Sequence, residues 1–198
     1  MDTLTKTIDT VKAEAKENLV PIVRDKTLEC LLKTCREIGA TKVLEIGTAT
    51  GYSALNILTV AQNVVTIEKN KERFEQAKQN FADAQVSLRV TQLLGDAGEV
   101  LQNLSAKGQI FDLIFLDGPK GQYLRYLPYI SHMLESGGIL FADNILLNGL
   151  FYDDSRVNHK NRAMVKNMRA FVEEIKNTSD FETTIYEIED GFAICKKQ

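Results

Sequence analysis

The sequence predicts an α/β protein built on a seven-stranded, mostly parallel sheet with helices on both faces. From residue 41 onward, short apolar runs alternate with amphipathic segments, which is the pattern of strand–helix units in a parallel sheet. The last two apolar runs flank the residues "EDG", a turn signal typical of a hairpin. A closing hairpin makes the last strand antiparallel to the others.

Two N-terminal helices are expected before the sheet. Apolar side chains recur at helical spacing over residues 2–18 and 24–38. With no linker or repeat further on, we predict a single domain over 1–198, divided into N-terminal helices (1–40) and a core (41–198).

The core strands alternate with helices along the chain. Strands are expected at 42–46, 63–68, 87–94, 111–117 and 137–143, and the closing strands at 182–187 and 192–195. The intervening helices are expected up to residue 58 and at 71–81, 97–104, 124–134 and 163–175.

Composition narrows the function classes. A net charge of −3 argues against a protein that binds nucleic acid over its whole surface, though a local basic patch remains open. No apolar run approaches the roughly 20 residues that span a bilayer, and the first residues lack the apolar segment of a secretion signal.

The cysteines are scattered without a CxxC pair, as expected of buried thiols in a reducing compartment: Cys30, Cys35 and Cys195. With only two histidines, a histidine-rich zinc site is not expected. We therefore expect a cytoplasmic protein without a membrane partner.

The first candidate site follows the first core strand. In "LEIGTATGY", Gly47 and Gly51 allow a tight turn that can approach a ligand, and Glu45 lies in the strand just before it. A plain tight turn explains the glycines equally well. The Gly-x-x-x-Gly spacing is not the G-x-G-x-x-G fingerprint of dinucleotide-binding proteins, which weakens a dehydrogenase interpretation.

Two further acids end the next strands. Glu68 stands about 20 residues after the glycine turn, where an acid can bind ribose hydroxyls, although a solvated glutamate beside Lys69 is the simpler alternative. Asp96 could meet an adenine amino group or cap the helix that begins at Ala97.

Oxygen ligands end the fourth and fifth core strands. Asp117 follows the buried run "FDLIFL", and Asp143 and Asn144 follow "GGILFA". Because the tips of these two strands are neighbours in a parallel sheet, we expect the three side chains to lie close together. Their oxygen atoms are ligands that suit Mg²⁺. An ion pair between Asp117 and Lys120 without a metal is the alternative.

The strand-end motifs in this order resemble the divalent-cation-dependent O-methyltransferases of the catechol and caffeoyl-CoA group, which use S-adenosylmethionine (SAM). The resemblance spans residues 41–195 and implies a Rossmann-like methyltransferase fold. It implies a cofactor site formed by Glu45, Gly47, Thr48, Tyr52, Ser53, Glu68, Asp96, Ala97 and Asp117. It also implies cation ligation by Asp117, Asp143 and Asn144, and catalysis by Lys120 with Asp117.

The metal-binding loop departs from the family pattern, because this chain has Gly118 where many relatives carry a second acid after the first metal-binding aspartate. The "KGQY" stretch and the pattern RxxVxxMxxF over 162–171 look like a bacterial subgroup that methylates 5-hydroxyuridine at the wobble position of tRNA. The alternative acceptor is a small catechol-like phenol. A NAD-dependent oxidoreductase or a non-catalytic binding protein would leave the oxygen cluster unexplained.

The expected mechanism places two adjacent acceptor oxygens on the cation, which lowers the pKa of the reacting hydroxyl. Lys120, with its pKa lowered by the metal charge, would accept the proton.

A local excess of basic residues supports the tRNA hypothesis, since cations can grip phosphates and aromatic rings can stack on an extruded base. A solvated helix face is the alternative. The residues 148–171 contain Arg156, Lys160, Arg162, Lys166 and Arg169 against Asp153 and Asp154, and Tyr123, Phe151 or Tyr152 could stack. The apolar faces of the N-terminal helices favour a homodimer, formed through these helices or through an outer edge of the sheet.

Overall fold

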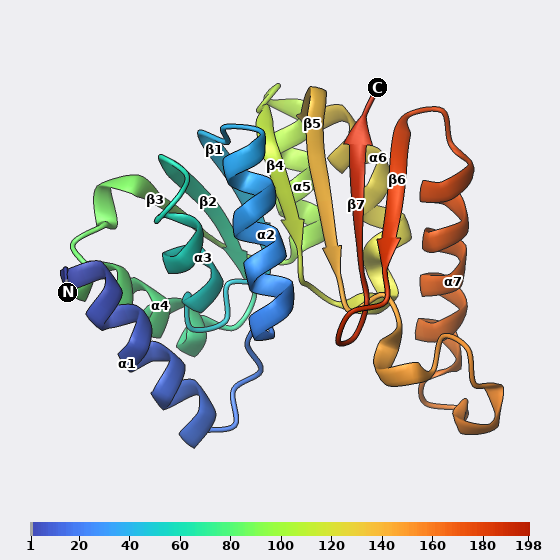
Figure 1. Cartoon of the computed structure of the whole chain (residues 1–198), viewed down its shortest axis with the longest axis horizontal. Helices are drawn as coiled ribbons and strands as arrows, with labels where there is room; N and C mark the ends of the chain where they lie inside the picture. The colour runs from blue at the N-terminus through green and yellow to red at the C-terminus, as the bar shows by residue number, and fades with distance from the viewer. Residues whose placement is uncertain (1) are drawn as a thin grey trace. The chain divides into compact units, whose positions relative to one another are not determined.

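The computed structural model describes residues 2–198, whose seven strands form a sheet in the order β3-β2-β1-β4-β5-β7-β6 (Figure 1). β2 pairs parallel with β1 and with β3, and β4 pairs parallel with β5. β7 runs antiparallel to both β5 and β6. The predicted mostly parallel sheet with an antiparallel last strand is confirmed.

The chain divides after Val100 into two compact units. The first contains α1 (Thr3–Glu17), α2 (Asp25–Glu37), β1 (Lys42–Ile46), α3 (Tyr52–Ile57), β2 (Asn63–Glu68), α4 (Lys71–Asp83), the 3-10 turn η1 (Ser87–Arg89) and β3 (Val90–Leu94). The helix α5 (Ala97–Ala106) crosses the division.

The second unit begins at Leu101. It contains β4 (Phe111–Leu116), η2 (Lys120–Gln122), α6 (Tyr123–Met133), β5 (Leu134–Asp143), η3 (Leu147–Gly149), η4 (Asp154–Arg156), α7 (Arg162–Asn177), β6 (Phe181–Tyr186) and β7 (Phe192–Lys197). None of the helices within residues 2–198 has the length and apolar character needed to cross a membrane.

Two predicted strand starts are wrong by three residues. Residues 87–89 form the turn η1, because Leu88 is fully exposed and the pairing with β2 begins only at Val90. β5 begins at Leu134 instead of residue 137, and its register with β4 shifts after Phe111. Such a bulge lets a strand absorb extra residues while it stays in the ladder.

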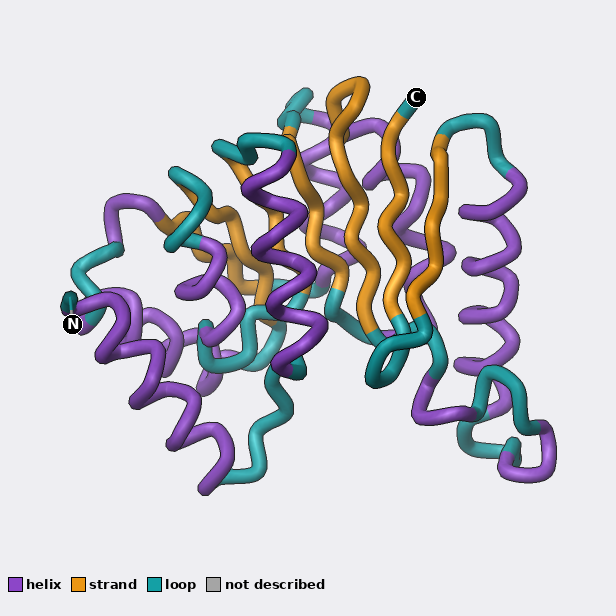
Figure 2. The backbone as a smooth tube through the Cα atoms, viewed as in Figure 1, coloured by secondary structure: helices purple, strands orange, loops and turns teal. Residues whose placement is uncertain are grey.

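Packing inside the second unit holds α7 against α6 and β6. The tube in Figure 2 shows α7 running alongside β6. Phe171 of α7 is fully buried and meets the ring of Tyr123 edge to face, with 5.4 Å between ring centroids. Nearer its start, Asn167 donates a hydrogen bond to the carbonyl oxygen of Gly121 at 2.9 Å. The first turns of α7 therefore lie next to the segment that carries Lys120.

Candidate functional site

The first group of predicted residues lies in the first unit, where β1 ends and α3 begins. The backbone N–H groups of Gly47 and Thr48 both donate to the carbonyl oxygen of Ile67, at 3.1 and 3.2 Å. Gly51 has a left-handed φ of 87°, and a Cβ there would lie 2.9 Å from the ring of Phe81. The turn therefore needs glycine at Gly51 for both its conformation and its packing.

Glu68 joins the end of β2 to this turn. One carboxylate oxygen accepts a hydrogen bond from the backbone N–H of Ala49 at 2.9 Å, and the other from that of Asn70 at 2.7 Å. The side chain is buried, so it is not the solvated glutamate that the sequence left open. The contact brings the acid at the end of β2 against the glycine turn, and its predicted ribose-binding role stays a prediction.

A buried polar network supports the turn from behind. Glu45 is fully buried and accepts hydrogen bonds from the hydroxyls of Ser53 and Thr66, the latter at 2.6 Å. The Thr66 hydroxyl also lies 2.5 Å from that of Thr48. Glu45 therefore orients hydroxyls of the turn and of α3. Thr66 was missed, although a hydroxyl inside the apolar run "NVVTIE" was a signal for it.

Thr50 provides a test of whether the turn fits a polar ligand. Within residues 2–198 its hydroxyl is the one buried side-chain atom without a hydrogen-bond partner. An unpaired buried hydroxyl costs on the order of 1–3 kcal/mol. A polar group bound against the turn would give it a partner, which fits a cofactor such as SAM.

The remaining residues of the predicted cofactor set are Tyr52, Asp96 and Ala97. Asp96 accepts from the backbone N–H of Gly98 at 3.0 Å and from Lys69 at 3.0 Å, so it caps α5, as the alternative proposed. Tyr52 and Ala97 are buried. Contact of these residues with a cofactor stays a prediction.

The second group lies in the second unit, at the ends of β4 and β5. The parallel register pairs Leu116 with Ala142, so the next residues, Asp117 and Asp143, continue side by side. The negative charge of Asp117 contributes to the raised pKa of Asp143. The two carboxylates therefore stand at neighbouring strand ends, and their shared role as metal ligands stays a prediction.

Lys120 and Tyr123 connect this pair of strand ends. The lysine Nζ lies 2.6 Å from a carboxylate oxygen of Asp117 and 2.9 Å from the hydroxyl of Tyr123. That hydroxyl also lies 2.9 Å from the carbonyl oxygen of Leu116 and 3.2 Å from that of Asp143. The Tyr123 hydroxyl thus contacts the last residues of both strands.

Burial and neighbouring groups shift the pKa values of Asp143 and Lys120. Burial raises the pKa of Asp143 to about 7, and repulsion by Asp117 adds to the effect. Burial alone would lower the pKa of Lys120, but interactions with Tyr123 and Asp117 outweigh it and raise that pKa. An added cation stabilises the ionised form of a buried carboxyl group with a raised pKa. The environment of Asp143 therefore fits a divalent metal at this position.

The third predicted metal ligand, Asn144, has a left-handed φ of 56°, and its N–H donates to the Asp143 carboxylate at 2.6 Å. Within residues 2–198, no three His, Cys, Asp or Glu side chains gather as ligands. Two carboxylates and one amide oxygen leave coordination positions for water or substrate, as Mg²⁺ sites commonly do.

Two expectations about substrate contacts are wrong. Tyr123 cannot stack on a base, because its ring is fully buried and its hydroxyl bridges the strand ends. Arg169 is not available to grip phosphate: its guanidinium donates to the carbonyl oxygens of Phe151 and Leu150 and pairs with Asp154 at 2.8 Å. Among the other predicted contacts, Arg156 donates to the carbonyl oxygen of Asn148 at 3.1 Å, and Lys160 and Arg162 are exposed.

Comparison with known proteins then identifies the family. The sequence model of the O-methyltransferase family matches residues 2–198. The chain belongs to this family. A solved structure of a candidate caffeoyl-CoA O-methyltransferase from Staphylococcus aureus shares 31% identity over 96% of this chain and 92% of its own, with a TM-score of 0.89. An O-methyltransferase from Bacillus cereus in complex with SAH shares 25% identity over 98% of this chain and 91% of its own, with a TM-score of 0.87.

The curated relatives match this chain over a smaller share of their own length than these two structures do. The catechol O-methyltransferase of Niastella koreensis is 28% identical over 66% of this chain and 59% of its own length. The chain spans about half the length of the first curated relatives that it matches, from 41% to 59%. The resemblance inferred from the strand-end motifs is confirmed at the level of the family.

Proposed function

We propose that this protein transfers a methyl group from SAM to a hydroxyl oxygen, with the help of Mg²⁺ or another divalent cation. The observation that carries the proposal is the cluster of Asp117, Asp143 and Lys120 at neighbouring strand ends, in a chain of the O-methyltransferase family. The SAH bound by the Bacillus cereus protein supports SAM as the cofactor. The match over residues 2–198 supports one methyltransferase domain.

The residues divide the work as follows. Glu68 and the glycine turn would hold the cofactor, with Glu45 fixing the hydroxyl of Ser53 behind them. Asp117, Asp143 and Asn144 would hold the cation. When bound, the cation would lower the pKa of an acceptor hydroxyl, and SAM would supply the methyl group.

Lys120 would move the acceptor's proton. Its raised pKa keeps Lys120 protonated while Asp117 is its ion-pair partner, and a protonated lysine cannot accept a proton. The base role expected for it therefore requires that the carboxylate of Asp117 be drawn towards a positive charge. Tyr123 keeps the lysine Nζ in place through the 2.9 Å contact. Asp117 thus couples cation binding to the basicity of Lys120.

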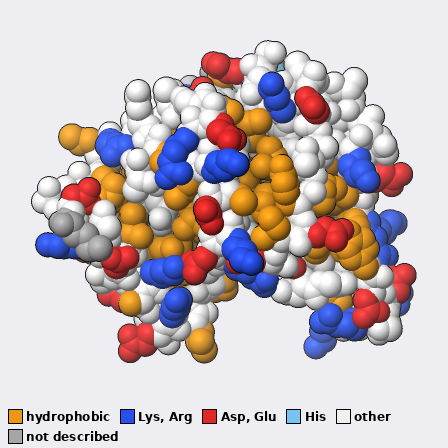
Figure 3. All heavy atoms as spheres, in the orientation of Figure 1, with side chains coloured by type: hydrophobic (Ala, Val, Ile, Leu, Met, Phe, Trp, Pro, Cys, Tyr) orange, Lys and Arg blue, Asp and Glu red, His pale blue; other side chains and the backbone are white. Residues whose placement is uncertain are grey.

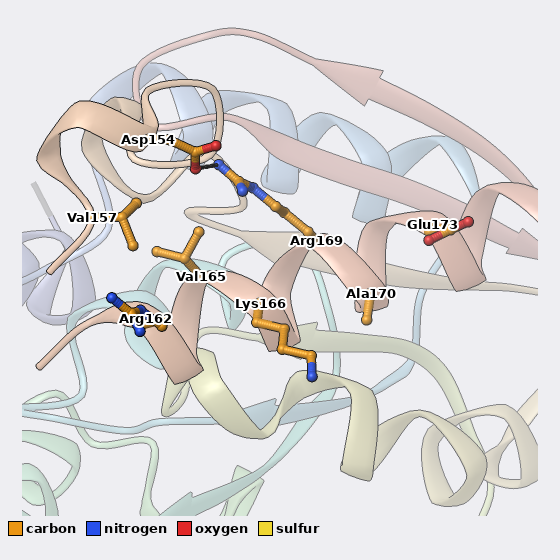
Figure 4. A pocket seen from close by; sticks show the side chains of 8 residues that line it. All are labelled: Asp154, Val157, Arg162, Val165, Lys166, Arg169, Ala170 and Glu173. Atoms are coloured by element: carbon orange, nitrogen blue, oxygen red, sulfur yellow. Dashed lines mark hydrogen bonds and ion pairs between the residues drawn. The ribbon is translucent and has the colours of Figure 1, made fainter. Parts of the chain in front are cut away.

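We further propose hydroxylated uridine in tRNA as the acceptor, since its 5-hydroxyl and neighbouring carbonyl offer two vicinal oxygens. A hollow of about 540 Å³ on α7, here called the α7 groove, supports this acceptor (Figure 4). It is lined by Asp154, Val157, Arg162, Val165, Lys166, Arg169, Ala170 and Glu173.

The charges of the α7 groove are arranged unevenly. Figure 4 shows Arg162 and Lys166 on the first turns of α7, the Asp154–Arg169 pair at one rim, and Glu173 further along the helix. Because Asp154 and Arg169 neutralise each other, the first turns remain basic. Figure 3 shows charged side chains of both signs over the segment between β5 and α7. An RNA phosphate at Arg162 and Lys166 fits this distribution.

A small catechol-like phenol is the second candidate acceptor. It is favoured by the named activity of the Niastella koreensis relative, and a catechol offers the same two vicinal oxygens.

Labelled SAM with Mg²⁺, offered either tRNA that carries 5-hydroxyuridine or a panel of phenols, separates the candidates. For tRNA, we expect Arg162→Ala and Lys166→Ala to lower transfer, while Lys176→Ala at the exposed end of the same helix leaves it unchanged. Label in phenols but not in tRNA would refute the tRNA acceptor. Label in neither, together with absent SAM binding, would refute methyl transfer itself.

We also propose a cytoplasmic homodimer. Leu19 and Ile38, which follow the two N-terminal helices, are exposed apolar side chains that a second copy could cover.

Cys35 and Cys195 are buried, and burial raises the pKa of each thiol to about 12, as suits thiols with a packing role.

A further inference from the structure

The backbone that follows β5 is held in an unusual conformation. Asn144, Leu147 and Asn148 have left-handed φ values of 56°, 53° and 52°. This region is disfavoured for residues with a side chain, and most of all for a large apolar one such as leucine. Such a segment, here called the post-β5 loop (residues 144–149), keeps its shape only when its surroundings impose it.

The turn between β6 and β7 imposes that shape. The carbonyl oxygens of Gly191 and Asp190 accept hydrogen bonds from the backbone N–H groups of Ile145 and Leu146, at 3.0 and 2.9 Å. The carboxylate of Asp190 accepts a further short one from the N–H of Asn148. Asp190 is only 4% exposed. Its buried carboxylate binds the backbone of a loop that lies 42 positions away in the sequence.

Gly191 lets the two segments approach. Its φ is 69°, and a Cβ at this position would lie 2.3 Å from Cγ of Leu146. Any larger residue would therefore push the turn and the post-β5 loop apart. Figure 1 shows the β6–β7 turn beside the end of β5.

These contacts enclose Asn144 from both sides. The residue before it, Asp143, pairs with Phe192 in the β5–β7 ladder, and the residue after it, Ile145, is bonded to Gly191. We propose that Asp190 and Gly191 are positioning residues for the divalent cation, because they fix the post-β5 loop and with it the oxygen atoms of Asp143 and Asn144. The inference rests on the cation-dependent function proposed above.

Direct binding of Mn²⁺, followed by electron paramagnetic resonance without SAM or acceptor, tests the role of Asp190. Loss of a residue that orients metal ligands weakens affinity by roughly 10- to 100-fold, and we expect this for Asp190→Ala. Asp190→Asn keeps an acceptor oxygen for the N–H of Asn148 and should stay within roughly threefold of the wild type. Amide hydrogen exchange at Ile145, Leu146 and Asn148 should accelerate in Asp190→Ala alone.

Gly191 allows a second test that does not depend on charge. Gly191→Ala should weaken Mn²⁺ binding, and adding Leu146→Ala should restore much of it by removing the atoms that the new Cβ meets. Gly137→Ala is the matched control, since its φ is 81° and nothing lies within 4 Å of its Cβ position. Thermal unfolding and SAM binding report whether each variant is folded.

The outcomes separate the inference from the proposed function. If folded Asp190→Ala binds Mn²⁺ as the wild type does, the positioning role is refuted while the cation site stands. If Asp190→Asn binds as weakly as Asp190→Ala, the negative charge acts instead of the hydrogen bond, and the positioning role is again refuted. If the wild type binds no Mn²⁺, the cation-dependent function itself fails, and the inference fails with it.

Discussion

Replacement of Tyr123 by phenylalanine separates two roles for this residue. The ring, which packs on Phe171, would be kept, and only the hydroxyl would be lost. A base-stacking residue would tolerate this change. A residue whose hydroxyl joins Lys120 to the ends of β4 and β5 would not.

The expected loss follows from the contacts. The hydroxyl can donate its single hydrogen to the carbonyl oxygen of Leu116 or of Asp143, and it accepts from Lys120. A neutral hydrogen bond contributes about 1 kcal/mol and one to a charged group about 1.5–3 kcal/mol. Because Lys120 keeps its ion pair with Asp117, we expect Tyr123→Phe to lower the free energy of unfolding by about 2–3 kcal/mol.

Urea unfolding followed by circular dichroism measures this difference, and Tm should fall by about 4–12 °C. Methyl transfer should also slow, because Lys120 loses one of its two anchors. Tyr152→Phe is the control: Tyr152 is 63% exposed and its hydroxyl donates to Glu187 at the surface. Loss of this hydroxyl should change stability by less than about 0.5 kcal/mol. If Tyr123→Phe matches the wild type in both stability and transfer, the bridging role is refuted.

Three further predictions concern the cation and the glycine turn. Asp143→Ala and Asp143→Asn should both abolish methyl transfer. In buffer with EDTA, Asp143→Asn should raise the free energy of unfolding by about 1–3 kcal/mol, because it removes a buried charge next to Asp117. Urea unfolding that shows Asp143→Asn to be less stable than the wild type would contradict this. EDTA should stop transfer while SAM binding, measured by titration calorimetry, persists through the glycine turn; transfer that survives exhaustive chelation would refute cation dependence. Gly51→Ala should lower the free energy of unfolding in urea by about 2–4 kcal/mol, because Gly51 has a left-handed φ and an added Cβ would lie 2.9 Å from Phe81. Gly39→Ala is the control, since Gly39 has a φ of 63° but no atom within 4 Å of its Cβ position, and it should lower this free energy by about 1 kcal/mol. Equal losses would refute the packing explanation.

Local sequence determined most of the secondary structure. β1 and β2 begin and end at the predicted residues, because apolar runs bounded by polar residues specify buried strands with little help from elsewhere. The strand start predicted at residue 87 was wrong for the opposite reason. Whether Ser87 continues β3 depends on a pairing partner in β2, and that partner begins only opposite Val90.

The convergence of Asp117 and Asp143 also followed from the sequence, because parallel strands end at one edge of a sheet. Their partners did not. The hydroxyl of Tyr123 and the carboxylate of Asp190 reach the ends of β4 and β5 from α6 and from the β6–β7 turn. Nothing in a linear pattern distinguishes a tyrosine whose hydroxyl bridges two strands from one that faces a ligand.

By itself, the sequence determined the α/β class, the antiparallel last strand and the strand ends at which oxygen-bearing side chains gather. These features depend on periodicity and on turn residues, which act over a few positions of the chain. Only the tertiary structure decided that Glu45 supports the glycine turn, that Arg169 holds the segment between β5 and α7, and that Asp190 fixes the post-β5 loop. Burial and long-range hydrogen bonds assign those roles, since they join residues that are distant in the sequence.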